Sequence, residues 1–318
     1  MKCLVCDNDV NNKVYAVKEM MFGYEDVFNY SECSACGCLQ IMNVPDDSQK
    51  YYPQEYYSFK TAEQIQTKTK IVYLIKKLRN KYAVFNRSFI GKMIHSFYPN
   101  RPLRSLNRIV RELNLRILDV GCGAGVFLCE LKELGFKNLL GVDPFIKEDL
   151  KTKNGVVIKK IDFLAIDCNF DIITFHHSFE HILSQLETLK KAYDLLSPNG
   201  CCLIRMPTMS SYAWQHYQLN WVQIDAPRHV LLHTCESIKL LSRKAGFSKI
   251  EIVYDSTDFQ LWGSEQCLNN IPLVSDRSYS VNPRKSIFTK QKINYYKKMA
   301  SRLDAQKLGD SFNVYLKK

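Results

Sequence analysis

The sequence contains no uncharged apolar run near the roughly 18 residues that a membrane-spanning helix needs. Its first twelve residues, MKCLVCDNDVNN, lack the apolar segment of a secretory signal peptide. Only 13 glycines and 10 prolines occur among 318 residues, which excludes collagen-like and low-complexity chains. The hydrophobic and charged fractions, 46% and 24%, are those of a globular protein. We therefore expect a folded protein of the cytoplasm.

The twelve cysteines are distributed unevenly along the chain. Four fall in two CxxC pairs, Cys3 with Cys6 and Cys33 with Cys36, and most of the others are scattered through apolar surroundings. A single metal site in a reducing compartment explains this distribution better than six disulfides do. Cys38 lies close to the second pair, but the two pairs already complete a ligand set, so we do not expect Cys38 to be a ligand.

The two CxxC pairs predict a tetrahedral site of four thiolates, which suits zinc. The intervening residues 13–31 are expected to form short β-strands. Because this segment is too short to be stabilised by its own core, the metal would supply its folding free energy. Four protein ligands leave no open position, so the expected zinc is structural. Four coincidental buried cysteines are the alternative. The predicted ligands are Cys3, Cys6, Cys33 and Cys36.

The formal net charge of +12 is concentrated in two segments. Residues 60–116 hold 14 basic and two acidic side chains, and residues 284–318 hold ten and two. Within the first segment, isoleucines and leucines recur at helical spacing over 61–82, with lysines and an arginine around them. This pattern predicts a basic amphipathic helix. Its basic face is either simply solvated or attracts phosphates or anionic lipid.

A strand followed by a glycine-rich turn marks the central part of the chain. Residues 116–125, RILDVGCGAG, predict a buried strand and a turn, and residues 126–135 predict the next helix. A second apolar strand ends at Asp143, 20 residues after Gly123. In dinucleotide-binding folds such glycines allow close backbone approach, and such an acid binds ribose hydroxyls. The third glycine comes one position early for the NAD fingerprint, so NAD is disfavoured.

The segment LDVGCGAG resembles motif I of the class I S-adenosylmethionine (SAM)-dependent methyltransferases, and more motifs follow in order. They are GVDP (141–144), IDF (161–163), the strand 170–175 with HHSFEH (176–181), the strand 201–207 and the closing strand 309–316. The resemblance implies a Rossmann-like α/β fold whose parallel sheet ends in an antiparallel strand. It also implies SAM-binding residues. These are Asp119, Gly121, Cys122, Gly123, Gly125, Asp143, Pro144, Asp162, Phe163 and His176.

Six of the seven histidines follow the fourth or the fifth expected strand, at the edge where α/β sheets bind ligands. We predict that His229 is the general base for the acceptor and that Asp225 orients His229 or the acceptor. A loop histidine bonded to backbone is the alternative for His229. A second hypothesis is that His177, Glu180 and His181 bind a divalent cation that lowers the pKa of the acceptor hydroxyl. Glu180 and His181 would otherwise cap the next helix.

The pattern W-x-x-x-D-x-P-R-H at 221–229 resembles bacterial methyltransferases of polysaccharide biosynthesis that carry an N-terminal zinc-binding unit. Residues 51–59, YYPQEYYSF, look like the N-terminus of that group, and the overall plan is similar to the deoxysugar C-methyltransferases. Arg228 stands where the latter have Glu, which favours O-methylation of a sugar hydroxyl over carbon methylation. Arg228 is expected to bind a phosphate or carboxylate, so the acceptor would be an anionic, nucleotide-linked or lipid-linked sugar.

Three other functions stay open. A ribosomal RNA methyltransferase would use the basic segment for phosphate contacts. A small aromatic or quinone O-methyltransferase is a further possibility, because the fold does not specify the acceptor. The third is a non-catalytic interaction module.

The expected organisation is a zinc-ribbon unit (1–59), a basic helical connector that covers the acceptor site (60–112) and the SAM-binding domain (113–318). Peripheral membrane contact would run through 60–116. Residues 264–308 contain no motif.

Overall fold

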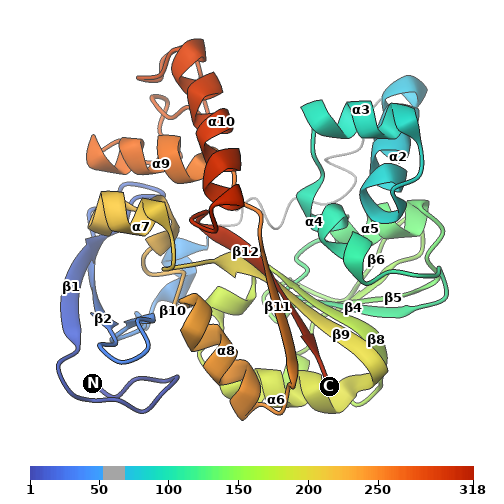
Figure 1. The fold of residues 1–318 in the computed structure, drawn as a ribbon, viewed down its shortest axis with the longest axis horizontal. Coiled ribbons are helices and arrows are strands. Elements are labelled where there is room, and N and C mark those ends of the chain that lie inside the picture. The colour runs from blue at the N-terminus through green and yellow to red at the C-terminus, as the bar shows by residue number, and fades with distance from the viewer. Residues whose placement is uncertain (53–68) are drawn as a thin grey trace.

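The computed structural model describes residues 1–52 and 69–318. An eight-stranded sheet forms its centre, in the order β11-β12-β9-β8-β4-β5-β7-β6 (Figure 1). Its strands are β4 (Arg116–Val120), β5 (Asn138–Val142), β6 (Leu150–Lys151), β7 (Val157–Lys159), β8 (Phe170–His176), β9 (Leu196–Pro207), β11 (Lys249–Tyr254) and β12 (Ser311–Lys317). Strands β4, β5, β7, β8 and β9 run parallel, and β12 is antiparallel to β9 and β11. This arrangement confirms the predicted Rossmann-like fold with a final antiparallel strand.

Helices cover both faces of this sheet because its central strands bury side chains alternately on either side. Ile117 and Ile172 belong to a core cluster shared with α5, whereas Leu118 and Ile173 belong to a second cluster shared with α6 and α8. Among the described residues, no helix is both long and apolar enough to cross a membrane. The α-helices are α2 (Lys70–Phe85), α3 (Phe89–Phe97), α4 (Arg101–Ser105), α5 (Val126–Glu133), α6 (Gln185–Leu195), α7 (Tyr212–Tyr217), α8 (Cys235–Lys244), α9 (Phe259–Leu268) and α10 (Lys290–Ala305). Short 3-10 helices are η1 (Ser48–Tyr51), η3 (Leu106–Arg108), η4 (Phe163–Ala165), η5 (Phe179–His181), η6 (Gln218–Asn220) and η7 (Val222–Ile224).

A second sheet, which we call the N-terminal sheet, joins the beginning of the chain to a loop near its middle. Its strands, in order, are β1 (Lys13–Lys18), β2 (Val27–Glu32), β3 (Leu39–Ile41) and β10 (Leu231–Leu232). β1 and β2 confirm the strands predicted between the cysteine pairs. β10 pairs antiparallel with β3, with Leu231 opposite Gln40. The cysteine-bearing unit and the large domain are therefore joined by backbone hydrogen bonds.

Three segments differ from the sequence prediction or extend beyond it. The helix predicted over 61–82 is observed as α2 from Lys70; its first part and most of 51–59 lie outside the described residues. Strand β9 starts at Leu196, five residues before the predicted strand 201–207, because Leu196 already pairs with Phe170 across a register shift. The stretch 264–308, for which no element was predicted, contains the end of α9 and all of α10.

Candidate active site

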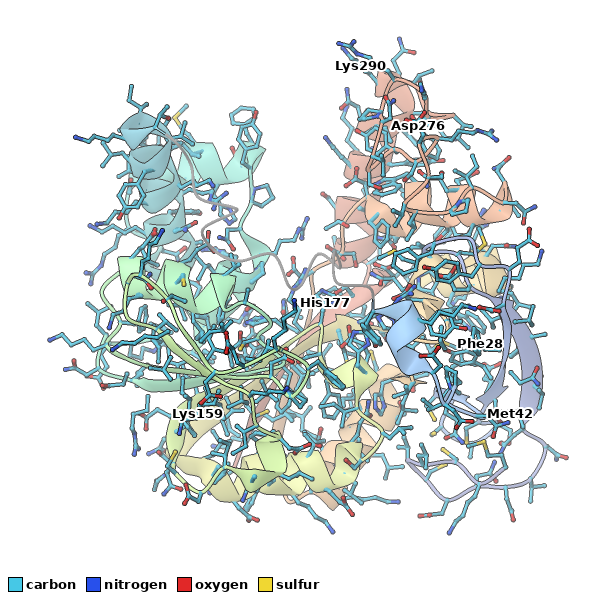
Figure 2. The ribbon with its side chains drawn as sticks, turned by 180° about the vertical axis from the view of Figure 1, so that it is seen from behind. Phe28, Met42, Lys159, His177, Asp276 and Lys290 are labelled. Carbon is cyan, nitrogen blue, oxygen red and sulfur yellow. The ribbon has the colours of Figure 1, made fainter. Side chains whose placement is uncertain are left out.

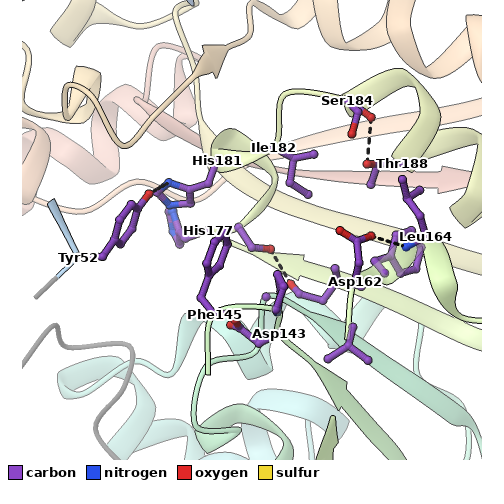
Figure 3. Close-up of a pocket in the computed structure, with 16 residues that line it drawn as sticks. Tyr52, Asp143, Phe145, Asp162, Leu164, His177, His181, Ile182, Ser184 and Thr188 are labelled. Atoms are coloured by element: carbon purple, nitrogen blue, oxygen red, sulfur yellow. Dashed lines mark hydrogen bonds between the residues drawn. The ribbon is translucent and has the colours of Figure 1, made fainter. Parts of the chain in front are cut away.

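A pocket opens at the carboxyl ends of β4, β5 and β8 (Figure 3). Five of the ten predicted SAM-binding residues line it, namely Gly121, Asp143, Pro144, Asp162 and Phe163. Two residues predicted for catalysis, His177 and His181, also line it. Tyr52 and Phe145 lie at the same pocket with their rings parallel, 3° between the planes and 6.3 Å between the centroids.

Backbone hydrogen bonds hold Asp143 in place at the end of β5. Its Oδ2 accepts a hydrogen bond from the backbone N–H of Gly123 and its Oδ1 accepts one from Phe145, each at 2.9 Å. An ionised carboxylate has about four lone-pair sites, so capacity remains for ligand hydroxyls. Gly121, which also lines the pocket, adopts φ 70°, and a Cβ there would collide with Ser178. The chain thus requires glycine where its backbone lines the pocket.

The other five predicted SAM-binding residues are not among those that line the pocket. Asp119 accepts a hydrogen bond from the Thr174 hydroxyl at 2.7 Å, and burial raises its pKa to about 7. His176 packs edge-on against Phe127, with 4.4 Å between ring centroids, and burial lowers the pKa of this histidine. These residues are therefore placed to shape the wall. The full set is Asp119, Cys122, Gly123, Gly125 and His176.

Four ionisable side chains converge beside the pocket: His177, Glu180, His181 and His229. Figure 2 places His177 at the centre of the molecule, between the N-terminal sheet and the outer strands of the large sheet. Glu180 is fully buried, with its Oε1 3.1 Å from His177 Nδ1 and 3.9 Å from His229 Nε2. Burial alone would raise the pKa of Glu180, but the His177 hydrogen bond and the nearby histidine charges lower it to about 2. Its Oε2 is buried without a hydrogen-bond partner among the described residues.

Backbone carbonyls fix the tautomers of two of these histidines. His229 Nδ1 lies 2.7 Å from the Gln223 carbonyl, and His181 Nδ1 lies 2.8 Å from the Arg228 carbonyl. Since a carbonyl only accepts, each Nδ1 carries a proton, and in the neutral ring it is Nε2 that has the lone pair. Glu180, His181 and His229 each offer one ligand atom within 4.8 Å of the others. The cluster can therefore hold a divalent cation, or His229 Nε2 can accept a proton.

Asp225 lies near His229, whereas Arg228 is buried in ion pairs with Asp225 and Glu19 and does not take the predicted anion-binding position. Asp225 Oδ2 is 3.8 Å from His229 Nε2, and the same carboxylate accepts hydrogen bonds from Arg228 at 2.9 and 2.5 Å. The Arg228 side chain is fully buried and also lies 3.4 Å from Glu19 of the N-terminal unit. A buried guanidinium between two carboxylates is not presented to the pocket. Arg228 instead joins the His229 loop to the N-terminal unit.

Glu19 is a residue that sequence reasoning missed. Its carboxylate accepts hydrogen bonds from four consecutive backbone N–H groups, those of residues 21–24, and is 1% exposed. It also pairs with Arg228, 209 residues further along the chain. No local pattern could have revealed that pairing, because an acid after a strand is ordinary in sequence.

We expect Glu19→Gln to destabilise the protein by roughly 2–4 kcal/mol, because breaking a buried ion pair leaves a charge less compensated and Asp225 offsets only part of that loss. Urea unfolding measures the change. Glu25→Gln, at an exposed acid in the same turn, is the matched control and should leave the unfolding midpoint unchanged. Equal effects of both substitutions would contradict the structural role of the Glu19 pair.

Further contacts tie the N-terminal unit to the His229 loop. The Tyr30 hydroxyl, fully buried, donates to the His229 carbonyl at 2.8 Å. The Thr234 hydroxyl donates to the Cys36 carbonyl at 2.7 Å. Together with the β3–β10 pairing, these bonds hold the backbone on either side of His229 against the cysteine unit.

The cysteines themselves form a compact cluster. Sγ atoms of Cys3 and Cys36 are 3.6 Å apart, those of Cys6 and Cys33 are 3.4 Å apart, and all four lie within 4.8 Å of one another. Zinc–sulfur bonds of about 2.3 Å place tetrahedral thiolates about 3.8 Å apart, so this cluster fits a small zinc-binding unit. Cys38 is closer than expected, with its Sγ 3.4 Å from that of Cys3.

Comparison with known proteins identifies the family. Residues 94–252, half of the 318-residue chain, match the family model described as a methyltransferase domain. The chain belongs to this family. The observed sheet order and the glycine loop agree with the class I SAM-dependent methyltransferase domain.

Two relatives of this methyltransferase carry related names. It is 34% identical over 122 residues to a ubiquinone biosynthesis O-methyltransferase of Bradyrhizobium diazoefficiens, covering 32% of this chain and 45% of that protein. It is 28% identical over 146 residues to the human mitochondrial ubiquinone biosynthesis O-methyltransferase, covering 41% and 37%. The methyltransferase thus spans less than half the length of these two relatives.

Among solved structures, the methyltransferase is similar to a SAM-dependent methyltransferase of Thermotoga maritima described as a possible histamine N-methyltransferase. The TM-score is 0.44 at 16% identity, covering 75% of this chain and 97% of that chain.

Proposed function

We propose that this chain transfers the methyl group of SAM to a hydroxyl of a small-molecule acceptor. The observation that carries the proposal is the meeting of two groups of residues at one pocket. Asp143 and Asp162 lie at one part of the pocket, and the cluster of His177, Glu180, His181 and His229 lies beside another. A donor and an acceptor can therefore lie side by side, which is the main requirement of an in-line transfer.

Each residue has a distinct role in this proposal. Bound SAM supplies an electrophilic methyl group. Asp143 accepts hydrogen bonds from the ribose hydroxyls, and Asp162 with Phe163 contacts the adenine. His229 Nε2 takes the proton of the acceptor hydroxyl as its oxygen becomes a nucleophile, which typically contributes about 10²–10⁴-fold in rate. Asp225 lies 3.8 Å from this nitrogen and stabilises the protonated ring.

A divalent cation is a second way for the same cluster to act. Glu180 is buried and ionised, and its Oε2 lacks a hydrogen-bond partner among the described residues, so its charge is suited to a cation. Glu180, His181 and His229 would hold this ion, and the bound ion would lower the pKa of the acceptor hydroxyl. His177 would then act by fixing Glu180 through their hydrogen bond.

For the acceptor we propose an aromatic hydroxyl. The names of the relatives support this choice over the sugar hydroxyl indicated by the N-terminal resemblance. Phe145, 80% exposed, and Tyr52 present parallel aromatic rings at the pocket, and flat aromatic acceptors pack well against such faces. The sugar hydroxyl is the second candidate. The resemblance that indicated it includes the N-terminal cysteine unit, and this unit lies outside the matched residues 94–252, so the family match does not bear on it. The buried Arg228 removes the main argument for an anionic acceptor.

The test is methyl transfer from labelled SAM to three acceptor pools: catechols and hydroquinones, a nucleotide-sugar and glycan extract, and ribosomal RNA. Label in the aromatic pool that is lost in His229→Ala supports the proposal. Label in the glycan pool would favour the sugar acceptor, and label in RNA would contradict both. The same assay with and without EDTA separates His229 as base from the cation.

We further propose that Cys3, Cys6, Cys33 and Cys36 bind structural zinc in a unit that spans 1–59. The 60–112 connector and the 113–318 domain complete the proposed organisation. The thiol separations support four ligands, because all four sulfur atoms lie within 4.8 Å of one another.

Zinc removal is expected to disorder the N-terminal sheet and to reduce methyl transfer, because the sheet holds the His229 loop. Cys33→Ser should have the same effect, since zinc supplies most of the folding free energy of such small units. Zinc content and amide hydrogen exchange over β1–β3 measure this. The control is Cys168→Ser, at an exposed cysteine remote in sequence from the cluster. Full zinc content in Cys33→Ser would show that this thiol is not a ligand.

A further inference from the structure

The helical pair α2–α3 exposes an unusual amount of apolar surface. We call residues 70–98 the α2–α3 surface. Eleven of its large hydrophobic side chains are exposed, including Phe89 at 77%, Phe97 at 75% and Ile71 at 71%. The set is Ile71, Val72, Tyr73, Leu74, Ile75, Leu78, Phe89, Ile90, Met93, Phe97 and Tyr98. Exposed apolar patches of this kind mark an interaction site.

The packing of the two helices explains why these side chains point outward. The carboxyl-terminal half of α2 is anchored to the large domain, since Asn80 bonds Glu130 of α5 at 3.2 Å and the Phe85 ring stacks on Phe136. α3 lies directly on α2 through Gly91, where a Cβ would collide with the Leu78 carbonyl.

On α3 itself, the face that contains Gly91 is turned towards α2. Phe89, Met93 and Phe97 recur every four residues, so they share another face of α3 and remain exposed. Figure 1 shows this pair at an end of the molecule, beyond α4 and α5. Glycine at the crossing therefore directs the aromatic side chains of α3 away from the protein.

The charge of the same surface has a single sign. Residues 70–98 contain seven lysines and arginines and not one aspartate or glutamate. Three exposed lysines, Lys77, Lys81 and Lys92, lie among the apolar side chains. Two copies of such a surface would repel each other, which argues against self-association. Nucleic acid would neutralise the positive charge of this surface, but it would leave most of its apolar side chains exposed to water.

We propose that the α2–α3 surface binds an anionic lipid bilayer. The aromatic and aliphatic side chains of α3 and the start of α2 enter the boundary between headgroups and acyl chains, while the lysines contact lipid phosphates. This is the combination of interfacial helices, in which buried apolar area and attraction to anionic lipid act together. The inference is independent of the acceptor, so its test needs no activity assay.

The experiment is vesicle co-sedimentation of the full chain, using phosphatidylcholine vesicles with and without phosphatidylglycerol. The wild type should bind only the anionic vesicles, and binding should weaken as salt rises. Phe89→Ser with Phe97→Ser should reduce binding at least about tenfold through lost apolar burial. Lys77→Glu with Lys81→Glu should also reduce binding at least about tenfold, because the reversed charges are repelled by the anionic lipid phosphates.

The matched control is Lys290→Glu with Lys297→Glu on α10, which changes the net charge equally at exposed positions elsewhere (Figure 2). This pair should bind like the wild type. Equal loss in both charge-reversal pairs would overturn the proposal, because the attraction would then be unspecific. Unchanged vesicle binding of the Phe89→Ser, Phe97→Ser variant would also overturn it. The same holds if the wild type is a dimer that these two substitutions dissociate, or if the wild type binds an RNA duplex as well as it binds the vesicles. Circular dichroism checks that each variant remains folded.

Discussion

Replacing Asp143 with alanine is expected to weaken SAM binding at least about 100-fold, because it removes two charge-assisted hydrogen bonds of about 1.5–3 kcal/mol each. The same substitution leaves the backbone N–H groups of Gly123 and Phe145 without their carboxylate. The glycine turn would then lose the contact that fixes it relative to β5. Calorimetric titration with SAM measures the effect directly.

Two other variants make this result specific to the site. Asp143→Asn keeps the shape of the side chain but removes its charge, so its SAM affinity should lie between those of the wild type and Asp143→Ala. Glu148→Gln removes an exposed acid close by in the chain and should bind SAM as the wild type does. Undiminished SAM binding in Asp143→Ala would show that another acid binds the ribose.

The His229→Ala variant is expected to lower kcat by about 10²–10⁴-fold and to leave SAM affinity unchanged. SAM affinity should not change because His229 does not line the pocket against which Asp143 and Asp162 lie. Rapid-mixing turnover with the accepted substrate, together with a SAM titration, gives both quantities. A parallel fall in SAM affinity would contradict the role of a base.

The Glu180→Gln variant separates the two chemical roles of the cluster. If His229 acts as a base without metal, activity should be insensitive to EDTA, and the loss in Glu180→Gln should be smaller than in His229→Ala. If a cation acts, EDTA should remove activity and added Mg²⁺ or Mn²⁺ should restore it in the wild type only. His233→Gln is not a suitable control, because His233 is buried between Ser237 and Gln185 and has a structural role.

The sheet was predictable from sequence because its signals are local. Each parallel strand is an apolar run, the glycine turn follows β4 directly, and Asp143 ends the next strand. The order of these motifs along the sequence is enough to indicate the class of fold without any tertiary contact. The same holds for the cysteine pairs, whose two-residue spacing predicts a shared turn.

The long-range contacts of the His229 loop were not predictable, since they join distant segments. Arg228 looked like an anion-binding residue because one of its two carboxylate partners, Glu19, lies 209 residues away in the sequence. Glu19 and Arg228 are brought together by the N-terminal sheet, in which β1, β2 and β3 join β10. α10 was missed for a different reason. Its buried positions, Ile293 and Tyr296 among them, stand among five lysines and arginines, which obscure the helical period.

The β3–β10 pairing limits where the chain can be divided into separate parts. A chain cut after residue 59 would leave β10 as an unpaired edge and the Tyr30 cavity open beside His229. An amino-terminal segment taken from a related enzyme would therefore not fit this catalytic domain if that segment alone were exchanged. Residues 225–234 would have to be transferred together with that segment. We therefore expect the two stretches to have changed together during evolution.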